Sequence, residues 1–346
     1  MPVLLQRPRA AVACLLLYCL TYGLSSPDPR QREALIKLEA SMQLGGQIVL
    51  TDAEQRLDAL LFKMKQEEMM RADFPPAMHF FKARALIGAS PIFRLLQKMP
   101  KGGALHVHDF AMTSVEWLVK NATYRPHCYM CLTDIQSVRF IFSVPAAQSS
   151  APVLSLDPAG KPQGQGGQRH RAGQQDPETV YPSQDEIWTT FEQAFLALLG
   201  LVTYAPVFRD YYYQGLTEFH TDNVMYLELR ALLPEIYELD GSTHDTAWTL
   251  KTYQHVTRQF ITEHPDFFGT RIIFTVHRAV NTSVLTRTVE EAMKLQRDFP
   301  DIMAGFDLVG REDSGKPLWY FKDVLSLPVE RGVTLPFFFH CWRDRS

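Results

Sequence analysis

The chain has 346 residues, enough for two domains or for one large barrel with an additional region. Hydrophobic residues make up 46% of it and charged residues 21%, which is ordinary for a globular protein. A formal net charge of −3, with no clustered basic stretch, argues against nucleic acid as a partner.

The first 26 residues have the organisation of a secretory signal. Arg7 and Arg9 form a basic start, residues 10–20 are apolar, and small residues follow at a cleavage position. The apolar run is too short for a membrane span, although a single uncleaved anchor is the alternative. We therefore expect 1–26 to be removed and the mature chain to be secreted and extracellular, with no membrane span.

Residues 27–98 are predicted to be helical. A capping box, Thr51-x-x-Glu54, begins a second helix after a Gly-Gly stop. The first helix carries an apolar stripe made of Leu35, Leu38 and Met42. Stripes of this kind usually pack into a core, and we interpret this one as packing.

Apolar strands alternate with helices through the rest of the chain. Helices are predicted near 247–262 and 288–298, and the strands are predicted at 104–108, 223–230, 271–276, 302–309 and 334–339. Near-continuous apolar strands separated by helices indicate a buried parallel sheet. The prediction is an α/β fold: a TIM-type (β/α)8 barrel, incomplete here at about five strands.

One stretch does not fit this pattern. Residues 144–175 are rich in Gln, Gly, Pro, Ser and Ala and contain no aromatic residue, so they bury too little apolar surface to order themselves. We expect a disordered insertion there, between a first part of the barrel at 99–143 and its continuation at 176–340.

Histidine and glycine recur where the predicted strands end. His106 and His108 lie on one face of the first strand, because side chains alternate with period two. His277, Gly310 and His340 each follow a later strand. Imidazole is the commonest metal ligand, so these positions are candidates for a metal site, while histidines that only fill core positions are the alternative.

Cysteines and glycosylation sequons matter in a chain that is predicted to be secreted, because disulfides and N-glycans form there. Without the signal, Cys128, Cys131 and Cys341 remain, an odd number. The Cys128-x-x-Cys131 pair is compatible with a redox or zinc half-site or with a structural disulfide to another cysteine, and the pairing stays open. Asn121 and Asn281 begin Asn-x-Ser/Thr sequons and are predicted glycosylation sites.

Several segments resemble the adenosine deaminase family. MPKGGALHVHD at 99–109, GFDLVG at 305–310 and PFFFH at 336–340 are similar to its signatures and occur in the expected order. MHFFKAR at 78–84 and TYAPVFRDYY at 203–212 resemble the secreted, growth-factor-related subgroup.

The resemblance implies a function and a set of site residues. The function is zinc-dependent hydrolytic deamination of adenosine or 2′-deoxyadenosine, with zinc activating a water molecule at neutral pH. His106, His108 and His340 would be the metal ligands. The implied substrate contacts are Asp109, Trp188, Phe191, Glu192, Phe195, His277 and Gly310. The helices before residue 98 resemble a dimerisation element, which implies a homodimer or a heterodimer with a full-length enzyme.

The chain departs from the family after His340. The family continues His-Ala-Gly-Glu and uses that glutamate as proton donor, whereas Arg343 stands at its position here, in a non-family tail at 341–346. A guanidinium cannot donate a proton usefully at neutral pH. Because strands six to eight are also missing, we expect a truncated and inactive deaminase relative. The alternatives are a non-catalytic, dimerising or growth-factor-like secreted protein and a truncated isoform without function.

Overall fold

The computed structural model describes 28–71, 73–132, 138–144, 153–155, 183–312 and 315–340. The predicted signal at 1–26, most of 144–175 and the tail at 341–346 lie outside these residues. The chain divides into two compact units, residues 1–74 and 75–346.

The first unit contains two helices, α2 (Pro29–Met42) and α3 (Asp52–Met69). The expected capping box is present, since Thr51 Oγ1 accepts from the Glu54 N–H while Glu54 accepts from the Thr51 N–H. Neither helix contains a buried residue, and Leu35 is 64% exposed. The predicted core packing of the α2 stripe is therefore not formed within the described residues of this unit.

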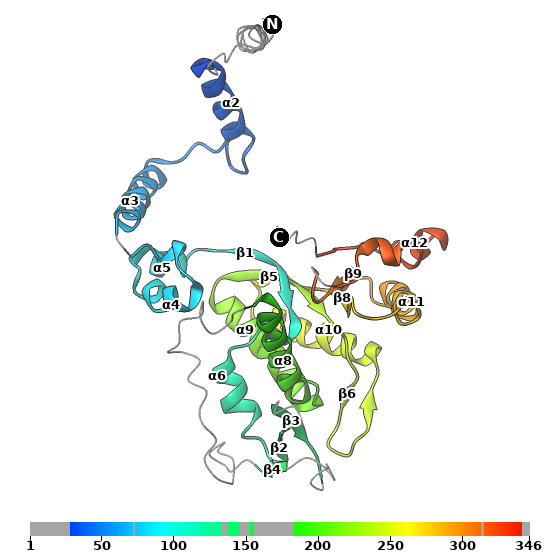
Figure 1. Ribbon diagram of the computed structural model, residues 1–346. Helices are drawn as coiled ribbons and strands as arrows, with labels where there is room; N and C mark the ends of the chain where they lie inside the picture. The colour runs from blue at the N-terminus through cyan, green and yellow to red at the C-terminus, as the bar shows by residue number, and fades with distance from the viewer. Residues whose placement is uncertain are drawn as a thin grey trace, which may run out of the picture. The chain divides into compact units, whose positions relative to one another are not determined.

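The second unit is built on a parallel sheet in the order β1-β5-β8-β9 (Figure 1). These strands are Gly102–His108, Val224–Ala231, Gly269–His277 and Met303–Val309. The helices between and after them are α9 (Ala205–Thr221), α10 (Thr246–Glu263), α11 (Thr282–Asp298) and α12 (Lys322–Glu330). Each strand lies beside the one before it in the sheet, as in a (β/α) barrel, so the predicted α/β class is confirmed, with the barrel not closed.

The predicted fifth strand at 334–339 is only partly formed. Phe337 makes a single parallel bridge to Phe306, where Phe306 N–H donates to the Pro336 carbonyl (2.8 Å) and Phe338 N–H donates to the Phe306 carbonyl (2.9 Å). Pro336 has no N–H to extend the ladder. The sheet therefore has four strands rather than five, and the segment that ends at His340 lies along β9.

A smaller antiparallel sheet, in the order β3-β2-β4, was not predicted. Its strands are β2 (Cys128–Leu132), β3 (Val138–Phe142) and β4 (Val153–Ser155). Strand β4 lies inside 144–175, so the expected disorder is wrong for these three residues, whose backbone pairs with β2. The other insertion residues after 144 lie outside the described part.

The remaining elements of the second unit are mostly short, apart from the helices α4 and α8. They are η1 (Pro75–Ala77), α4 (Phe80–Ala89), α5 (Pro91–Leu96), η2 (Asp109–Ala111), α6 (Val115–Trp117), η3 (Leu118–Ala122), α8 (Gln184–Val202), β6 (Ile236–Tyr237), β7 (Thr243–His244) and η4 (Leu318–Phe321). The core between sheet and helices includes fully buried Tyr212, Tyr253 and Phe306. Within the described residues, no helix combines the length and apolar character that a bilayer crossing requires.

Candidate metal centre

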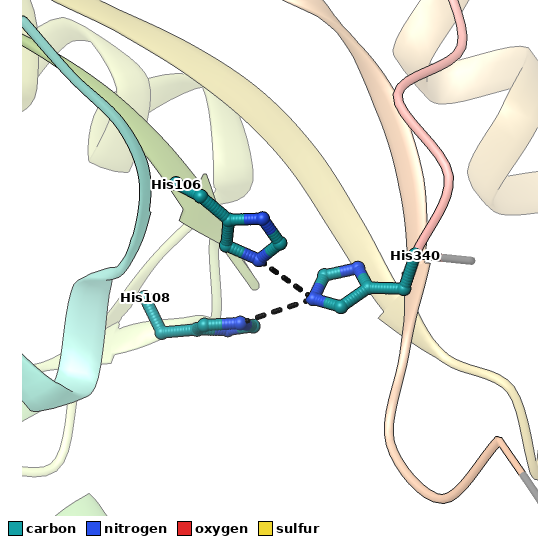
Figure 2. A group of neighbouring side chains, drawn as sticks. All are labelled: His106, His108 and His340. Carbon is teal, nitrogen blue, oxygen red and sulfur yellow. Dashed lines mark hydrogen bonds between the residues drawn. The ribbon is translucent and has the colours of Figure 1, made fainter. Parts of the chain in front are cut away.

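Three imidazoles converge at the carboxyl ends of the strands. His106 and His108 project from the same face of β1 toward His340, as Figure 2 shows. The Nε2 atom of His340 lies 2.8 Å from His106 Nε2 and 3.2 Å from His108 Nε2. In the described part of the chain, these three form the one group of metal-ligating side chains close enough to share an ion.

The donor set fits a divalent metal such as zinc. Zinc with tetrahedral Zn–N bonds of about 2.0–2.1 Å places its ligand nitrogens about 3.3 Å apart; the His108–His340 separation of 3.2 Å matches this value, and the His106–His340 separation of 2.8 Å is shorter. Burial lowers the pKa of His108 to about 4, with a further contribution from His340, and lowers the pKa of His106. Both shifts favour the neutral imidazole, which is the form that binds metal.

Two residues that we did not predict support His340. Asp307 on β9 is fully buried, and its Oδ2 lies 2.6 Å from His340 Nδ1, while its Oδ1 accepts from the His340 N–H (3.1 Å). Buried Arg230 on β5 places Nε 3.6 Å from Asp307 Oδ2 and donates through Nη1 to the Leu105 carbonyl. The sequence signal was the lone charge in the apolar strand β9 and the arginine in β5, whose other charge is Glu228, because a buried charge needs a partner.

A cavity of about 510 Å³ is lined by two of the three histidines. It contains His108 and His340 together with every predicted substrate-contact residue: Asp109, Trp188, Phe191, Glu192, Phe195, His277 and Gly310. These residues come from η2, α8, β8 and the loop after β9, so the fold unites positions 201 residues apart in sequence, from Asp109 to Gly310. The structure places them together but assigns them no role.

Helix α8 forms the aromatic wall of this cavity. It begins at the Ser183 cap, whose Oγ accepts from the Glu186 N–H (3.3 Å). Ring centroids of Trp188 and Phe191 lie 5.8 Å apart, and those of Phe191 and Phe195 lie 4.9 Å apart, both edge-on. Phe191 remains 53% exposed, which leaves apolar surface available to a planar ligand.

Helix α8 also carries Glu192, which has polar partners on neighbouring segments. Arg311 donates to both Glu192 oxygens from Nε (3.3 Å) and Nη2 (3.2 Å), a bidentate pair that fixes the carboxylate. His277 Nδ1 accepts from the Ala279 N–H (3.2 Å), so the neutral ring carries its proton on Nε2, which lies 3.8 Å from Glu192 Oε1. Gly310 has φ +103°, and a Cβ there would lie 2.3 Å from His277 Nε2, so this position requires glycine.

Asp109 is more deeply buried than the other predicted contacts, at 3% exposure. Its carboxyl group accepts from the Tyr253 hydroxyl (3.2 Å) and from the Phe110 N–H (2.9 Å). Burial raises the pKa of Asp109 to about 7, although these hydrogen bonds act in the opposite direction. The two hydrogen bonds hold the Asp109 carboxyl group in one position in the cavity lining.

The remaining predicted positions are spread over the molecule. Asn121 and Asn281 are both exposed, and Asn281 caps α11 through Oδ1. Cys128 and Cys131 on β2 form no disulfide within the described residues, while Cys341 and Arg343 lie outside them.

Comparison with known proteins identifies the family. The family profile described as Adenosine/AMP deaminase N-terminal matches residues 24–96. Adenosine deaminase 2-A of Danio rerio is 54% identical, with 96% of this chain and 68% of the relative covered. Adenosine deaminase 2 of Homo sapiens is 39% identical, with 99% and 70% covered. Adenosine deaminase 2 of Sus scrofa is 44% identical, with 91% and 66% covered.

The chain therefore belongs to the adenosine deaminase family, as its motifs predicted, and it resembles relatives named adenosine deaminase 2. It spans about two thirds of the length of these relatives. A solved Arabidopsis N6-mAMP deaminase superposes with a TM-score of 0.41 and 15% identity, over 72% of this chain and 60% of that chain, a likeness too distant to add to the argument.

Proposed function

We propose that this chain binds one zinc ion through His106, His108 and His340 and binds an adenosine-type nucleoside in the adjoining cavity. The convergence of three Nε2 atoms, two of them from residues that line that cavity, carries the proposal. Its support is the family membership together with a cavity that combines an aromatic wall with a few polar groups, the composition typical of small-molecule sites.

Different residues of the cavity would contact different parts of the nucleoside. The rings of α8 offer an apolar surface to a purine, and Glu192, fixed by Arg311, offers oxygens to ribose hydroxyls. The Nε2 proton of neutral His277 is available to an acceptor on the ligand. A bound zinc ion would supply an acidified water for hydrolytic deamination of adenosine or 2′-deoxyadenosine.

We infer that this chain binds nucleoside without turning it over. Deamination requires an acid that protonates the purine ring, and Arg343 stands where the family has glutamate. An arginine keeps its proton at any pH at which the protein is folded. Arg343 replaces only the proton donor, and the proposed zinc and nucleoside sites do not depend on it.

The test uses the purified full chain, stripped of metal and titrated with zinc, with His106→Ala as the matched control. We expect one zinc per chain, binding of adenosine that depends on zinc, and no inosine above the control. Zinc binding equal to that of His106→Ala would overturn the metal site. Inosine production well above the control would overturn the inference about the missing donor.

A second proposed role is self-association through the first unit. The α2 stripe of Leu35, Leu38 and Met42 is exposed, which leaves an apolar surface that a second copy or a full-length relative would cover. Sedimentation of the chain against Leu38→Glu tests this role, and equal monomer fractions would remove it. We also propose secretion and glycosylation at Asn121 and Asn281, with a mass decrease after glycosidase treatment as the measurement.

A further inference from the structure

The position of His340 depends on a pair of buried charges that belongs to no predicted site. Asp307 Oδ1 accepts two backbone N–H groups, from Leu308 (2.7 Å) and from His340 (3.1 Å). Its Oδ2 lies 2.6 Å from His340 Nδ1 and 3.6 Å from Arg230 Nε. The side chains of Asp307 and Arg230 are 0% and 8% exposed, so the arrangement is shielded from solvent.

These contacts determine which nitrogen of His340 carries the proton. A carboxylate accepts hydrogen bonds and donates none, so His340 Nδ1 must carry the proton that lies between it and Asp307. The neutral ring then presents an unprotonated Nε2, and this is the atom that faces His106 and His108 in Figure 2.

Arg230 connects this carboxylate to the strand that carries the other two histidines. It extends from β5 to Asp307 on β9 and to the Leu105 carbonyl on β1, next to His106. The same guanidinium therefore compensates the buried carboxylate and links the two segments that must approach each other. Partners of this kind commonly set the orientation and proton position of a metal-binding histidine.

We propose that Arg230 and Asp307 are positioning residues that hold His340 as the Nδ1–H tautomer and thereby prepare the three-histidine site for a divalent metal. The proposal rests on the metal site proposed above. It adds that metal affinity depends on Asp307 as a hydrogen-bond acceptor, and not only on the three ligands.

Asp307→Asn separates this role from a merely structural one. The oxygen of the new amide must remain at the Oδ1 position, because two backbone N–H groups point at it. The NH₂ group is then forced toward His340 Nδ1, which must become an acceptor, and the proton moves to Nε2. An Nε2–H faces the metal position and cannot ligate, the same wrong-tautomer logic that applies to an aspartate-to-asparagine change beside a catalytic histidine.

The control for this variant is Thr275→Val. Thr275 pairs directly with Asp307 in the sheet and is 2% exposed, and its hydroxyl makes no hydrogen bond to any described residue, so valine replaces it at the same depth and removes no hydrogen bond from Asp307 or His340.

The experiment titrates the metal-free full chain with Co²⁺ and follows the visible absorption of the bound ion. We expect one cobalt per chain for the unmodified protein and for Thr275→Val, and affinity about 10- to 100-fold weaker for Asp307→Asn. Equal affinity for Asp307→Asn and Thr275→Val overturns the proposal. Failure of the unmodified chain to bind cobalt overturns instead the metal site on which it rests.

A second measurement needs no variant and so does not depend on whether Asp307→Asn folds. Nitrogen NMR of the metal-free, unmodified chain at pH 8 reports which ring nitrogen of each histidine is protonated. We expect His340 as the Nδ1–H tautomer, and assignment of its proton to Nε2 overturns the proposal directly.

Discussion

Gly200 joins the aromatic helix α8 to the small sheet at very short range. A Cβ at this position would lie 1.8 Å from the Phe140 carbonyl oxygen on β3, far below any normal contact. The same junction contains hydrogen bonds from Tyr237 Oη to the Gly200 carbonyl (2.6 Å) and from Arg139 Nη1 to the Leu196 carbonyl (3.0 Å). Helix and strand therefore meet backbone to backbone, and alanine would force them apart by more than an ångström.

The expected effect of Gly200→Ala is the balance of two terms. Alanine in a helix is better than glycine by about 1 kcal/mol. Separation of packed backbones costs about 1–3 kcal/mol, and strain on the two hydrogen bonds costs about 1 kcal/mol more for each one lost. We expect a net loss in the free energy of unfolding of about 1–3 kcal/mol, together with weaker nucleoside binding, because α8 carries Trp188 and Phe191.

Gly88→Ala is the matched control for this test. Gly88 lies near the end of α4, as Gly200 lies near the end of α8, but a Cβ there meets nothing within 4 Å. We expect this variant to stabilise by about 0.5–1 kcal/mol. Urea unfolding followed by circular dichroism measures both variants. If Gly200→Ala stabilised the chain as Gly88→Ala does, the close approach of α8 and β3 would be refuted.

Three further predictions follow from burial and close contact. Gly310→Ala should lower the free energy of unfolding, measured in urea, by about 1–3 kcal/mol, because φ is +103° and the new Cβ meets His277. The loss should be smaller in a His277→Ala background, and an unchanged loss would exclude the contact. Burial raises the pKa of both β2 thiols, and it raises that of the more deeply buried Cys128 to about 12, so iodoacetamide should alkylate Cys131 before Cys128, as peptide mass mapping would show; equal rates would contradict this. Burial also raises the pKa of Tyr212 to about 12 from an ordinary 10.0, so the folded state favours the neutral phenol. The contribution of Tyr212 to the free energy of unfolding should therefore fall between pH 10 and 12, by about 1.4 kcal/mol per pH unit. An identical dependence of unfolding free energy on pH in Tyr212→Phe would refute this prediction.

The parallel sheet was predictable because its signals are local. The predicted strand at 302–309 became Met303–Val309, and the predicted helix at 247–262 became Thr246–Glu263. Strand β4 was not predictable, because its neighbours at 144–175 have the composition of a disordered segment and only pairing with β2 orders it. For the α2 stripe the sequence pattern identified the apolar face of the helix correctly, but periodicity does not say what covers that face.

The site was predictable in its residue types but not in their arrangement. His277 and His340 are both histidines that follow an apolar segment of the barrel, so their position in the pattern ranks them equally as ligands, and only the family resemblance separated them. The structure separates them through Asp307, which faces His340, whereas His277 Nδ1 is bonded to the Ala279 N–H. That difference depends on one bridge, Phe306 to Phe337, because side chains alternate with period two. A shift of one residue there would turn His340 away from Asp307 and from the other two imidazoles, so the metal centre depends on the register of a segment too short to be counted as a strand.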